Sequence, residues 1–257
     1  MASDTTTGSD RSTGVSRLVE VRDALEGPNT LGNSRAFWIG FIVIVATLLA
    51  YPMMRSTYYV SNTAFLLTSA FLGLSLCLIW GYAGILSFGQ VAFYGVAGYA
   101  FGVVGINVSG PLGTMLGVVV SVILAAGLAL VLGYFMFYGG IRDVYVAIIT
   151  LAVTLVLNTF FGQTAGDEWS IGDAPLGGFN GMTDIPNLTI GAGDAAVVVE
   201  DVAFYYFIVL TLLVTYLGLR VLVNSYIGYV LVAIRENQAR TELLGYDTKR
   251  IKLGVFT

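Results

Sequence analysis

The sequence predicts an all-α polytopic membrane protein. We expect about six transmembrane helices, a broken or re-entrant glycine-rich segment, and one helix on the cytoplasmic side. Of the 257 residues, 56% are hydrophobic and only 11% are charged, whereas a soluble domain carries about 25% charged residues. The mean hydropathy is +0.82. Apolar runs of about 20 residues, the length that crosses a bilayer, recur along the chain.

The composition also excludes several classes of site. The chain has no histidine and a single cysteine, so zinc sites, Ser-His-Asp triads and disulfides are not expected. We therefore predict no metal and no cofactor. Cys77 lies within an apolar run and is interpreted as a packing residue. The 12 basic residues, against 16 acidic ones, form no cluster that would bind nucleic acid.

Residues 1–35 are polar and rich in serine, threonine and charged side chains. No apolar core follows a short basic start, so this segment is not a secretory signal. We predict a largely disordered cytoplasmic tail, followed by a transmembrane domain over residues 36–257.

Six apolar runs are long enough to span a membrane. They cover residues 36–54, 58–79, 91–108, 112–138, 144–161 and 202–223. A long polar loop, 162–201, separates the last two runs, and a polar segment, 224–250, follows the sixth. Residues 251–257 resemble the start of a further apolar run, so we expect the chain to be cut short at its C-terminus.

Charge near the ends of the spans predicts their orientation, because Lys and Arg are enriched on the cytoplasmic side. Segment 224–250 is basic, whereas loop 162–201 holds acidic residues and no basic one. We therefore place the segment and the N-terminal tail in the cytoplasm and the loop outside. Arg142 agrees with this orientation and Arg55 does not. The acidic loop fits either a high-salt habitat or an ordinary exposed surface.

The segment from Trp80 to Gln90 is expected to break the helix after the second run. It contains Gly81, Gly84 and Gly89, and each glycine lowers helix stability by about 1 kcal/mol relative to alanine. Broken backbone within a membrane is tolerated where protein or a water-filled cavity surrounds it, and such breaks often lie at transport sites. This segment, called the break below, is the first candidate for the functional centre.

Ser87 and Gln90 stand in the spacing of a helix capping box. The Ser87 hydroxyl would accept a hydrogen bond from the Gln90 N–H, and the Gln90 side chain would bond back to the Ser87 N–H. The third span would then begin beside a cavity, where its free N–H groups would attract a carbonyl or an anion. An ordinary turn at the membrane surface is the alternative.

Two sets of small or polar residues lie on single helix faces. In the fifth span Thr150, Thr154 and Asn158 are spaced by four, so they share one face. They would line a transport path, or the hydroxyls would bond back to carbonyls of their own helix. In the third span, glycines at 95, 98, 102 and 105 predict close packing of a neighbouring helix, within one subunit or between subunits.

Residues 226–244 predict a charged helix outside the membrane, ended by Gly245 in the C′ position. A second helix is expected to begin at Asp247 or Thr248. A charged helix between two spans is a natural docking surface for a soluble partner. A solvated loop is the alternative.

Several stretches resemble permease subunits of the ABC importers for branched-chain amino acids and urea. The resemblance is carried by residues 81–89 (GYAGILSFG), 145–152 (YVAIITLA), 177–184 (GGFNGMTD), 230–237 (VLVAIREN) and 244–247 (LGYD). The family usually has histidine where this chain has Gln90. Trp80 and the stretches 180–184 and 244–247 are closest to the second, C-type, urea permease. Family members normally continue through several further spans.

This resemblance implies a multi-pass subunit in a prokaryotic plasma membrane, assembled with a second permease, two ATP-binding subunits and an extracytoplasmic solute-binding protein. The partners would bind and hydrolyse ATP, so the chain itself is not an enzyme. The helix at 226–244 would pass ATPase movement to the spans. The expected coupling residues are Ala233, Arg235, Glu236, Ala239, Arg240 and Gly245. The expected path residues are Ser87, Gln90, Thr150, Thr154 and Asn158.

Urea or a related small amide is the expected substrate, with a branched-chain amino acid as the alternative. A stand-alone carrier or channel is a competing class, but it would need ion-coupling carboxylates, and no Asp or Glu lies within the six runs. A structural subunit of a respiratory complex would have no ATPase-docking helix.

Overall fold

The structure is a computed structural model that describes residues 24–30, 32–141, 144–166, 168–191 and 196–257. Predictions for residues 1–23, Arg142, Asp167 and Asp194 lie outside these ranges.

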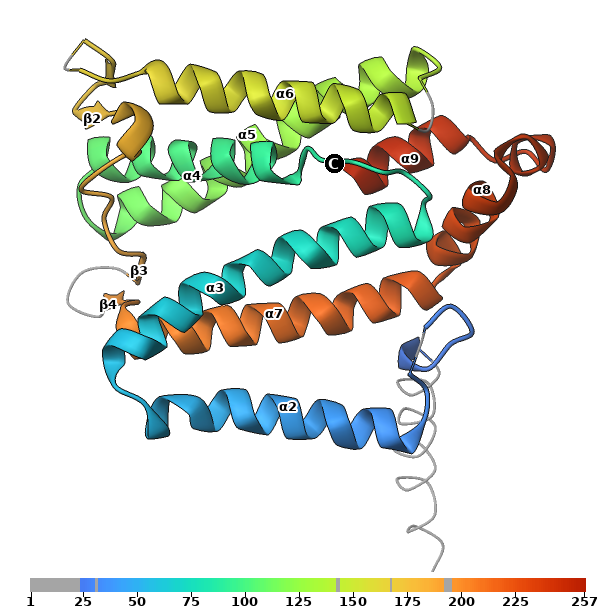
Figure 1. Ribbon diagram of the computed structural model, residues 1–257, viewed down its shortest axis with the longest axis horizontal. Coiled ribbons are helices and arrows are strands. Elements are labelled where there is room, and N and C mark those ends of the chain that lie inside the picture. Colours follow the sequence, from blue (N-terminus) through green and yellow to red (C-terminus); the bar gives the residue numbers. More distant parts are fainter. Residues whose placement is uncertain (1–23, 31, 142–143, 167, 192–195) are drawn as a thin grey trace, which may run out of the picture.

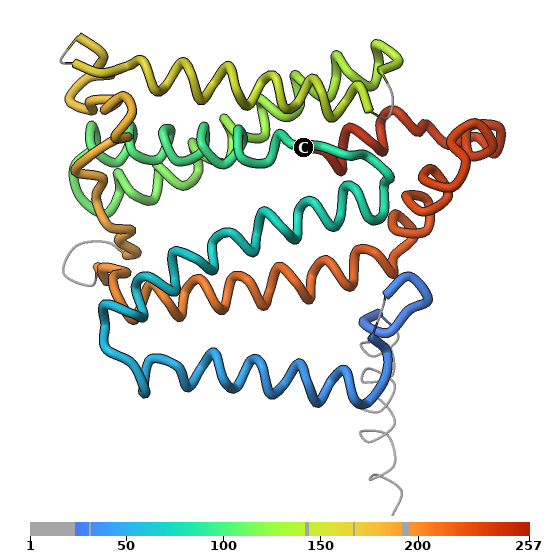
Figure 2. The backbone as a smooth tube through the Cα atoms, viewed as in Figure 1, coloured from blue at the N-terminus to red at the C-terminus, as the bar shows by residue number. Residues whose placement is uncertain are grey.

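Six helices run side by side across the molecule and connect at its two ends (Figures 1 and 2). They are α2 (Arg35–Met54), α3 (Thr57–Leu76), α4 (Gln90–Asn107), α5 (Pro111–Tyr138), α6 (Val144–Gln163) and α7 (Asp201–Asn224). Helices α2, α3 and α7 form one group and α4, α5 and α6 the other (Figure 1). The end that holds residues 164–200 is called the loop end. The opposite end carries α8 (Tyr226–Leu243) and α9 (Thr248–Phe256) and is called the α8 end.

The predicted all-α membrane fold is confirmed, and each predicted span matches a helix. In the described part of the chain, five helices are long and apolar enough to cross a membrane: α2, α3 with its extension to Tyr82, α5, α6 and α7. Helix α4 is not among them, because polar Gln90 and Asn107 lie at its ends and glycines dilute its apolar residues. The crossing predicted for 91–108 is completed by the non-helical segment before α4, which continues to the α8 end (Figure 1).

The predicted break is confirmed. Helix α3 continues as a π-helix, η1 (Cys77–Tyr82), and residues 84–89 then form no regular structure before α4 begins part-way along the bundle (Figure 1). Gly81 lies within η1, and Gly84 has a φ of +70°, which L-residues other than glycine rarely adopt. Gly89 is the residue just before α4. The change of direction therefore centres on Gly84.

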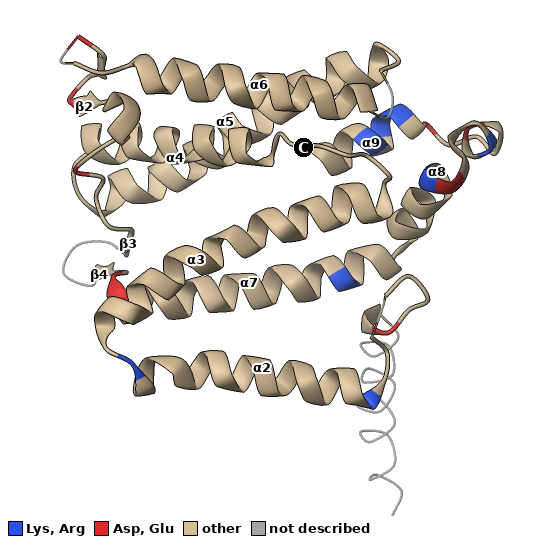
Figure 3. Ribbon diagram, viewed as in Figure 1, with Lys and Arg blue, Asp and Glu red and all other residues tan. Residues whose placement is uncertain are grey.

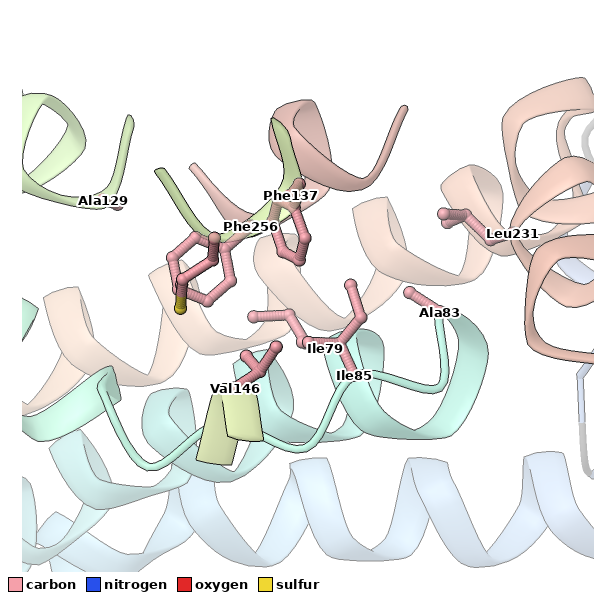
Figure 4. Packing of buried hydrophobic residues seen from close by; sticks show 9 residues of the cluster. Ile79, Ala83, Ile85, Ala129, Phe137, Val146, Leu231 and Phe256 are labelled. Atoms are coloured by element: carbon pink, nitrogen blue, oxygen red, sulfur yellow. The ribbon is translucent and has the colours of Figure 1, made fainter. Parts of the chain in front are cut away.

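The break lies within the main hydrophobic core (Figure 4). Ile79, Ala83 and Ile85 come from η1 and the break, and they pack with residues of four helices. Those residues are Ala129, Met136 and Phe137 of α5, Val146 of α6, Leu231 of α8 and Phe256 of α9. A smaller cluster joins α3 to α7 through Val60, Ala64, Tyr205 and Val209. The unwound backbone is thus enclosed by protein, as broken helices at membrane depth require.

The long polar loop predicted for 162–201 contains short ordered elements. Strands β1 (Ser170–Ile171) and β2 (Ala174–Pro175) form one antiparallel hairpin, and β3 (Thr189–Ile190) and β4 (Val197–Val198) form another. A 3-10 turn, η2 (Gly178–Asn180), lies between the hairpins in sequence. Figure 3 shows Asp and Glu along this loop, whereas much of the Lys and Arg lies on α8 and α9.

Part of the predicted disordered tail is ordered. Residues 24–30 and 32–34 pack against the α8 end of α7, so the prediction of disorder as far as residue 35 is wrong for this part. Asn224 Nδ2 donates to the Ala24 carbonyl at 3.1 Å, and Asn29 Nδ2 donates to the Val223 carbonyl at 2.9 Å. The second bond satisfies the Val223 carbonyl at the end of α7, where partners inside the helix are missing.

The glycines of α4 were expected to pack against a neighbouring helix. The structure differs, because loop residues contact part of this face and the rest faces open space. A Cβ at Gly102 would lie 2.9 Å from Met182 Sδ, and one at Gly105 would lie 2.9 Å from Pro186 Cγ. Residues of the loop end therefore occupy this part of the face. At Gly95 and Gly98 an added Cβ would meet open space.

Candidate functional site

Helix α6 holds the break through the backbone of Phe88. The Phe88 N–H donates to Thr150 Oγ1 at 3.0 Å, and the Thr154 hydroxyl donates to the Phe88 carbonyl at 3.0 Å. Both polar groups of this non-helical residue are thus satisfied by two side chains one turn apart on α6. The two hydroxyls also bond back to carbonyls of α6, at Val146 and Thr150. Thr150 is fully buried, so it acts here as an anchor of the break.

The predicted capping box between Ser87 and Gln90 is wrong. A capping box would need Ser87 as the N-cap residue. The N-cap is instead Gly89, two residues later, and no side chain caps the helix. The buried Ser87 Oγ instead accepts from the Gly89 N–H at 3.1 Å, within the loop. Gln90 Nε2 is buried and has no hydrogen-bond partner. Its amide is therefore the unsatisfied polar group of the break.

Arg235 on α8 contacts the opposite side of the break. Its Nη1 donates to the Gly81 carbonyl, at the end of η1. A Cβ at Gly84 would lie 2.8 Å from Arg235 Cγ, so the side chain crosses directly over the turn. Arg235 also forms a salt bridge with Glu236 at 2.8 Å. The predicted coupling helix and the predicted break are thus in direct contact.

The predicted coupling residues lie on the outer surface of α8, except Gly245, which follows the helix. Ala233, Arg235, Glu236, Ala239, Arg240 and Gly245 are exposed. Leu243 and Leu244 are 89% and 72% exposed, which is unusual for large apolar side chains beside so many charges. The inner surface is anchored by Leu231, which is completely buried. The helix therefore has one side fixed to the core and one side free for contact.

Helix α8 is kinked at Asn237, where φ is −159° and ψ is 93°. The Asn237 Oδ1 accepts from the Arg240 N–H at 2.9 Å and so caps the second half of the helix. This kink was not predicted from the sequence, although an asparagine followed by helix-forming residues is the signal for such a cap.

The two predicted helix ends near Gly245 are confirmed. Gly245 has a φ of +92°, and its N–H donates to the Glu242 carbonyl while the Tyr246 N–H donates to the Thr241 carbonyl. This pattern is a Schellman motif. Asp247 then caps α9 by accepting from the Arg250 N–H at 3.1 Å. Nearby, a hydrogen bond to Tyr246 raises the pKa of the Tyr226 hydroxyl, because ionisation would remove the donated hydrogen.

Polar side chains join the second half of α8 to α9. Gln238 and Thr248 each donate to Glu242 Oε1, at 2.8 and 2.6 Å, and Lys252 Nζ donates to Gln238 Oε1 at 2.6 Å. Helix α9 then packs against α5, and Phe256 reaches the main core. A movement of the α8 surface would therefore be passed to α5 as well as to the break.

A cavity of about 460 Å³ lies between α4, α6 and η2. Thr154, Asn158 and Asn180 give it polar groups, and Tyr99 and Phe161, stacked with ring centroids 3.9 Å apart, lie on its wall. The residues lining it include no charged side chain. Of the predicted path residues, Thr154 and Asn158 meet here, whereas Ser87, Gln90 and Thr150 do not line this cavity. The contribution of η2 to this cavity was not predicted from the sequence.

Comparison with known proteins gives the family. Residues 58–257, more than three quarters of the chain, match the family model described as branched-chain amino acid transport system / permease component. The chain belongs to this family. No curated protein and no solved structure matches it. The permease is thus a multi-pass membrane component of a transport system, and the matched residues include the break, α6, α8 and α9.

Proposed function

We propose that the permease forms the membrane path of an ATP-driven importer and that α8 is the surface to which an ATP-binding subunit docks. The contact between Arg235 and the break carries this proposal. A hydrogen bond from Arg235 to the Gly81 carbonyl joins the exposed surface of α8, which carries charged and apolar side chains, to the break. Family membership supports a transport role for this arrangement.

The contacts suggest how movement would travel. An ATP-binding subunit would press on the outer surface of α8 around Glu236, Arg240 and Leu243. Arg235 would transmit that displacement to η1, and the hydrogen bonds of Phe88 would carry it to α6. Since α6 forms one wall of the cavity, its displacement would change access to Thr154 and Asn158.

We place the α8 end in the cytoplasm and the loop end outside the cell, in a prokaryotic plasma membrane. The Lys and Arg residues of α8 and α9 support this orientation, because such residues are enriched on the cytoplasmic side. The importer would contain a second permease and two ATP-binding subunits. A solute-binding protein would deliver the substrate at the loop end.

Urea or a related small amide is the proposed substrate. The cavity offers hydroxyl and amide groups without charge, which suit a small neutral molecule with several donors and a carbonyl. Ser87 and Gln90 would form the part of the path nearest the break, and Thr150 would support it. A branched-chain amino acid is the second candidate, and the description of the family model favours it.

Uptake of labelled urea and labelled leucine, in cells with and without the gene, tests the substrate. Loss of urea uptake alone supports the urea assignment, and loss of leucine uptake alone transfers the role to the amino acid. If deletion changes neither, the import function is refuted.

The coupling step is tested separately with Arg235→Ala in the assembled importer. Substrate-stimulated ATP hydrolysis and uptake should become uncoupled while the permease still inserts and assembles. Arg250→Ala is the matched control, because Arg250 forms an exposed salt bridge with Asp247 at 2.9 Å and is not in contact with the break. Equal uptake by both variants would contradict the coupling role of Arg235.

A further inference from the structure

An apolar groove lies between α2, α3 and α7, away from the proposed path. Its volume is about 320 Å³, and all its lining residues are apolar or aromatic. They include Ile44 and Leu48 of α2, Gly73 and Leu74 of α3, and Leu213 and Tyr216 of α7. None of the 20 residues of α2 is buried, and the groove separates this helix from α3 and α7. At Gly73 an added Cβ would meet open space.

A second cavity, of about 190 Å³, adjoins this groove towards the α8 end. The two share Leu74 and Tyr216 in their linings. The second cavity adds polar groups from Thr30 and Tyr82 and the guanidinium of Arg220. An apolar channel among membrane-crossing helices therefore leads to a polar end that contains a cation.

The charge of Arg220 is buried, and no carboxylate of the described residues is paired with it. The residue is 4% exposed, and in the described residues all its hydrogen-bond acceptors are neutral. The closest are Leu25 O at 2.9 Å, Tyr216 Oη at 3.2 Å and Asn33 Oδ1 at 3.2 Å. The rings of Phe37 and Trp38 lie 4.9 and 5.1 Å from its Cζ. A buried charge is costly unless an opposite charge balances it, so this end of the channel favours an anion.

We propose that the groove and its adjoining cavity bind one phospholipid with an anionic headgroup. Its acyl chain lies between α2, α3 and α7, and its phosphate faces Arg220. The guanidinium is suited to phosphate by its planar set of N–H donors, and one Nη1 hydrogen is not used by the contacts above. Helix α2 and the segment around Leu25 and Asn33 lie outside the residues that match the family, whereas Leu74, Tyr216 and Arg220 lie within them. The site is therefore formed jointly by the matched permease and the segment that precedes it.

Thermal unfolding of the purified permease in detergent tests the site. Phosphatidylglycerol and phosphatidylcholine with the same acyl chains are titrated separately, and inorganic phosphate is titrated alone. Phosphatidylglycerol should raise the melting temperature at concentrations about fivefold lower than phosphatidylcholine, and phosphate should have no effect. An equal response to both lipids would overturn the anionic specificity, and a shift produced by phosphate alone would replace the lipid by a free anion.

Two variants separate the chain from the headgroup. Gly73→Leu fills the groove and should weaken the response to both lipids, whereas Gly40→Leu, placed on α2 in open space, should leave it unchanged. Arg220→Gln should retain the response to phosphatidylcholine and lose the preference for phosphatidylglycerol. If Arg220→Gln does not fold, Gly73→Leu decides: an unchanged lipid response in that variant refutes the site.

Discussion

Replacing Thr150 with valine tests whether α6 holds the break in place. Valine keeps the shape of threonine but has no hydroxyl, so the Phe88 N–H loses the acceptor that lies 3.0 Å away. Thr150 is completely buried, so water cannot readily take the place of the hydroxyl. Loss of such a hydrogen bond lowers the free energy of unfolding by about 0.5–1.5 kcal/mol. The hydrogen bond from the Thr150 hydroxyl to the Val146 carbonyl is lost as well. Its loss should change the free energy of unfolding little, because that carbonyl lies within helix α6.

Thr211→Val is the matched control for this substitution. The Thr211 hydroxyl donates to the Phe207 carbonyl at 2.8 Å, four residues earlier on α7, and this exposed bond joins no other segment. Its loss should change the free energy of unfolding by less than about 0.5 kcal/mol. Thermal unfolding of the two purified variants gives the comparison, because each kcal/mol shifts the melting temperature of a chain of this size by about 2–4 °C.

The expected result is a melting temperature for Thr150→Val well below that of Thr211→Val. Equal melting temperatures would refute the conclusion that the hydrogen bond to Phe88 fixes the break. A stable Thr150→Val permease without uptake would instead indicate that Thr150 contacts substrate, as the sequence analysis had predicted.

Three further substitutions address the break and α8. Gly84→Ala should destabilise the permease more than Gly245→Ala. Both glycines have a positive φ, a conformation that costs alanine about 1–2 kcal/mol. Only at position 84 would the added methyl group also collide with a side chain, that of Arg235. Thermal unfolding compares them, and equal losses would contradict the close contact across the turn. Gln90→Ala should lower the free energy of unfolding, measured by denaturant titration, by less than about 0.5 kcal/mol, because the amide caps no helix and its Nε2 has no partner. A decrease above about 1 kcal/mol would show that the Gln90 side chain does stabilise the fold. Asn237→Ala should remove a helix cap worth about 1 kcal/mol, measured as a lower melting temperature, and no change would mean that the kink does not depend on this cap.

Hydropathy predicted the helices well because each span must bury about 20 residues in lipid whatever its neighbours are. The predicted second span, 58–79, ends within the π-helix η1, and the predicted fifth span, 144–161, ends two residues before α6 does. Glycine content likewise predicted the break, since the cost of glycine in a helix is local. The end of α8 at Gly245 was predicted for a similarly local reason, because glycine readily adopts the positive φ that ends a helix.

The capping box failed because the start of α4 is not decided locally. Thr150 and Thr154, more than 60 residues away in sequence, hold Phe88 in a non-helical conformation, so the helix begins after Gly89. The same two threonines had been assigned to a path from their spacing on one helix face. Spacing showed that they share a face, but it could not show that Phe88 lies against that face.

The sequence by itself determined the membrane fold, the order of the spans, the position of the break and the charged helix that follows the sixth span. These depend on hydropathy, glycine and charge, which act over a few residues. Tertiary structure alone decided that Arg235 lies over Gly84, that η2 lines the cavity beside Asn158, and that Leu25 and Asn33 accept hydrogen bonds from Arg220. Each of these contacts joins segments far apart in the chain, and their partners are selected by how the helices pack.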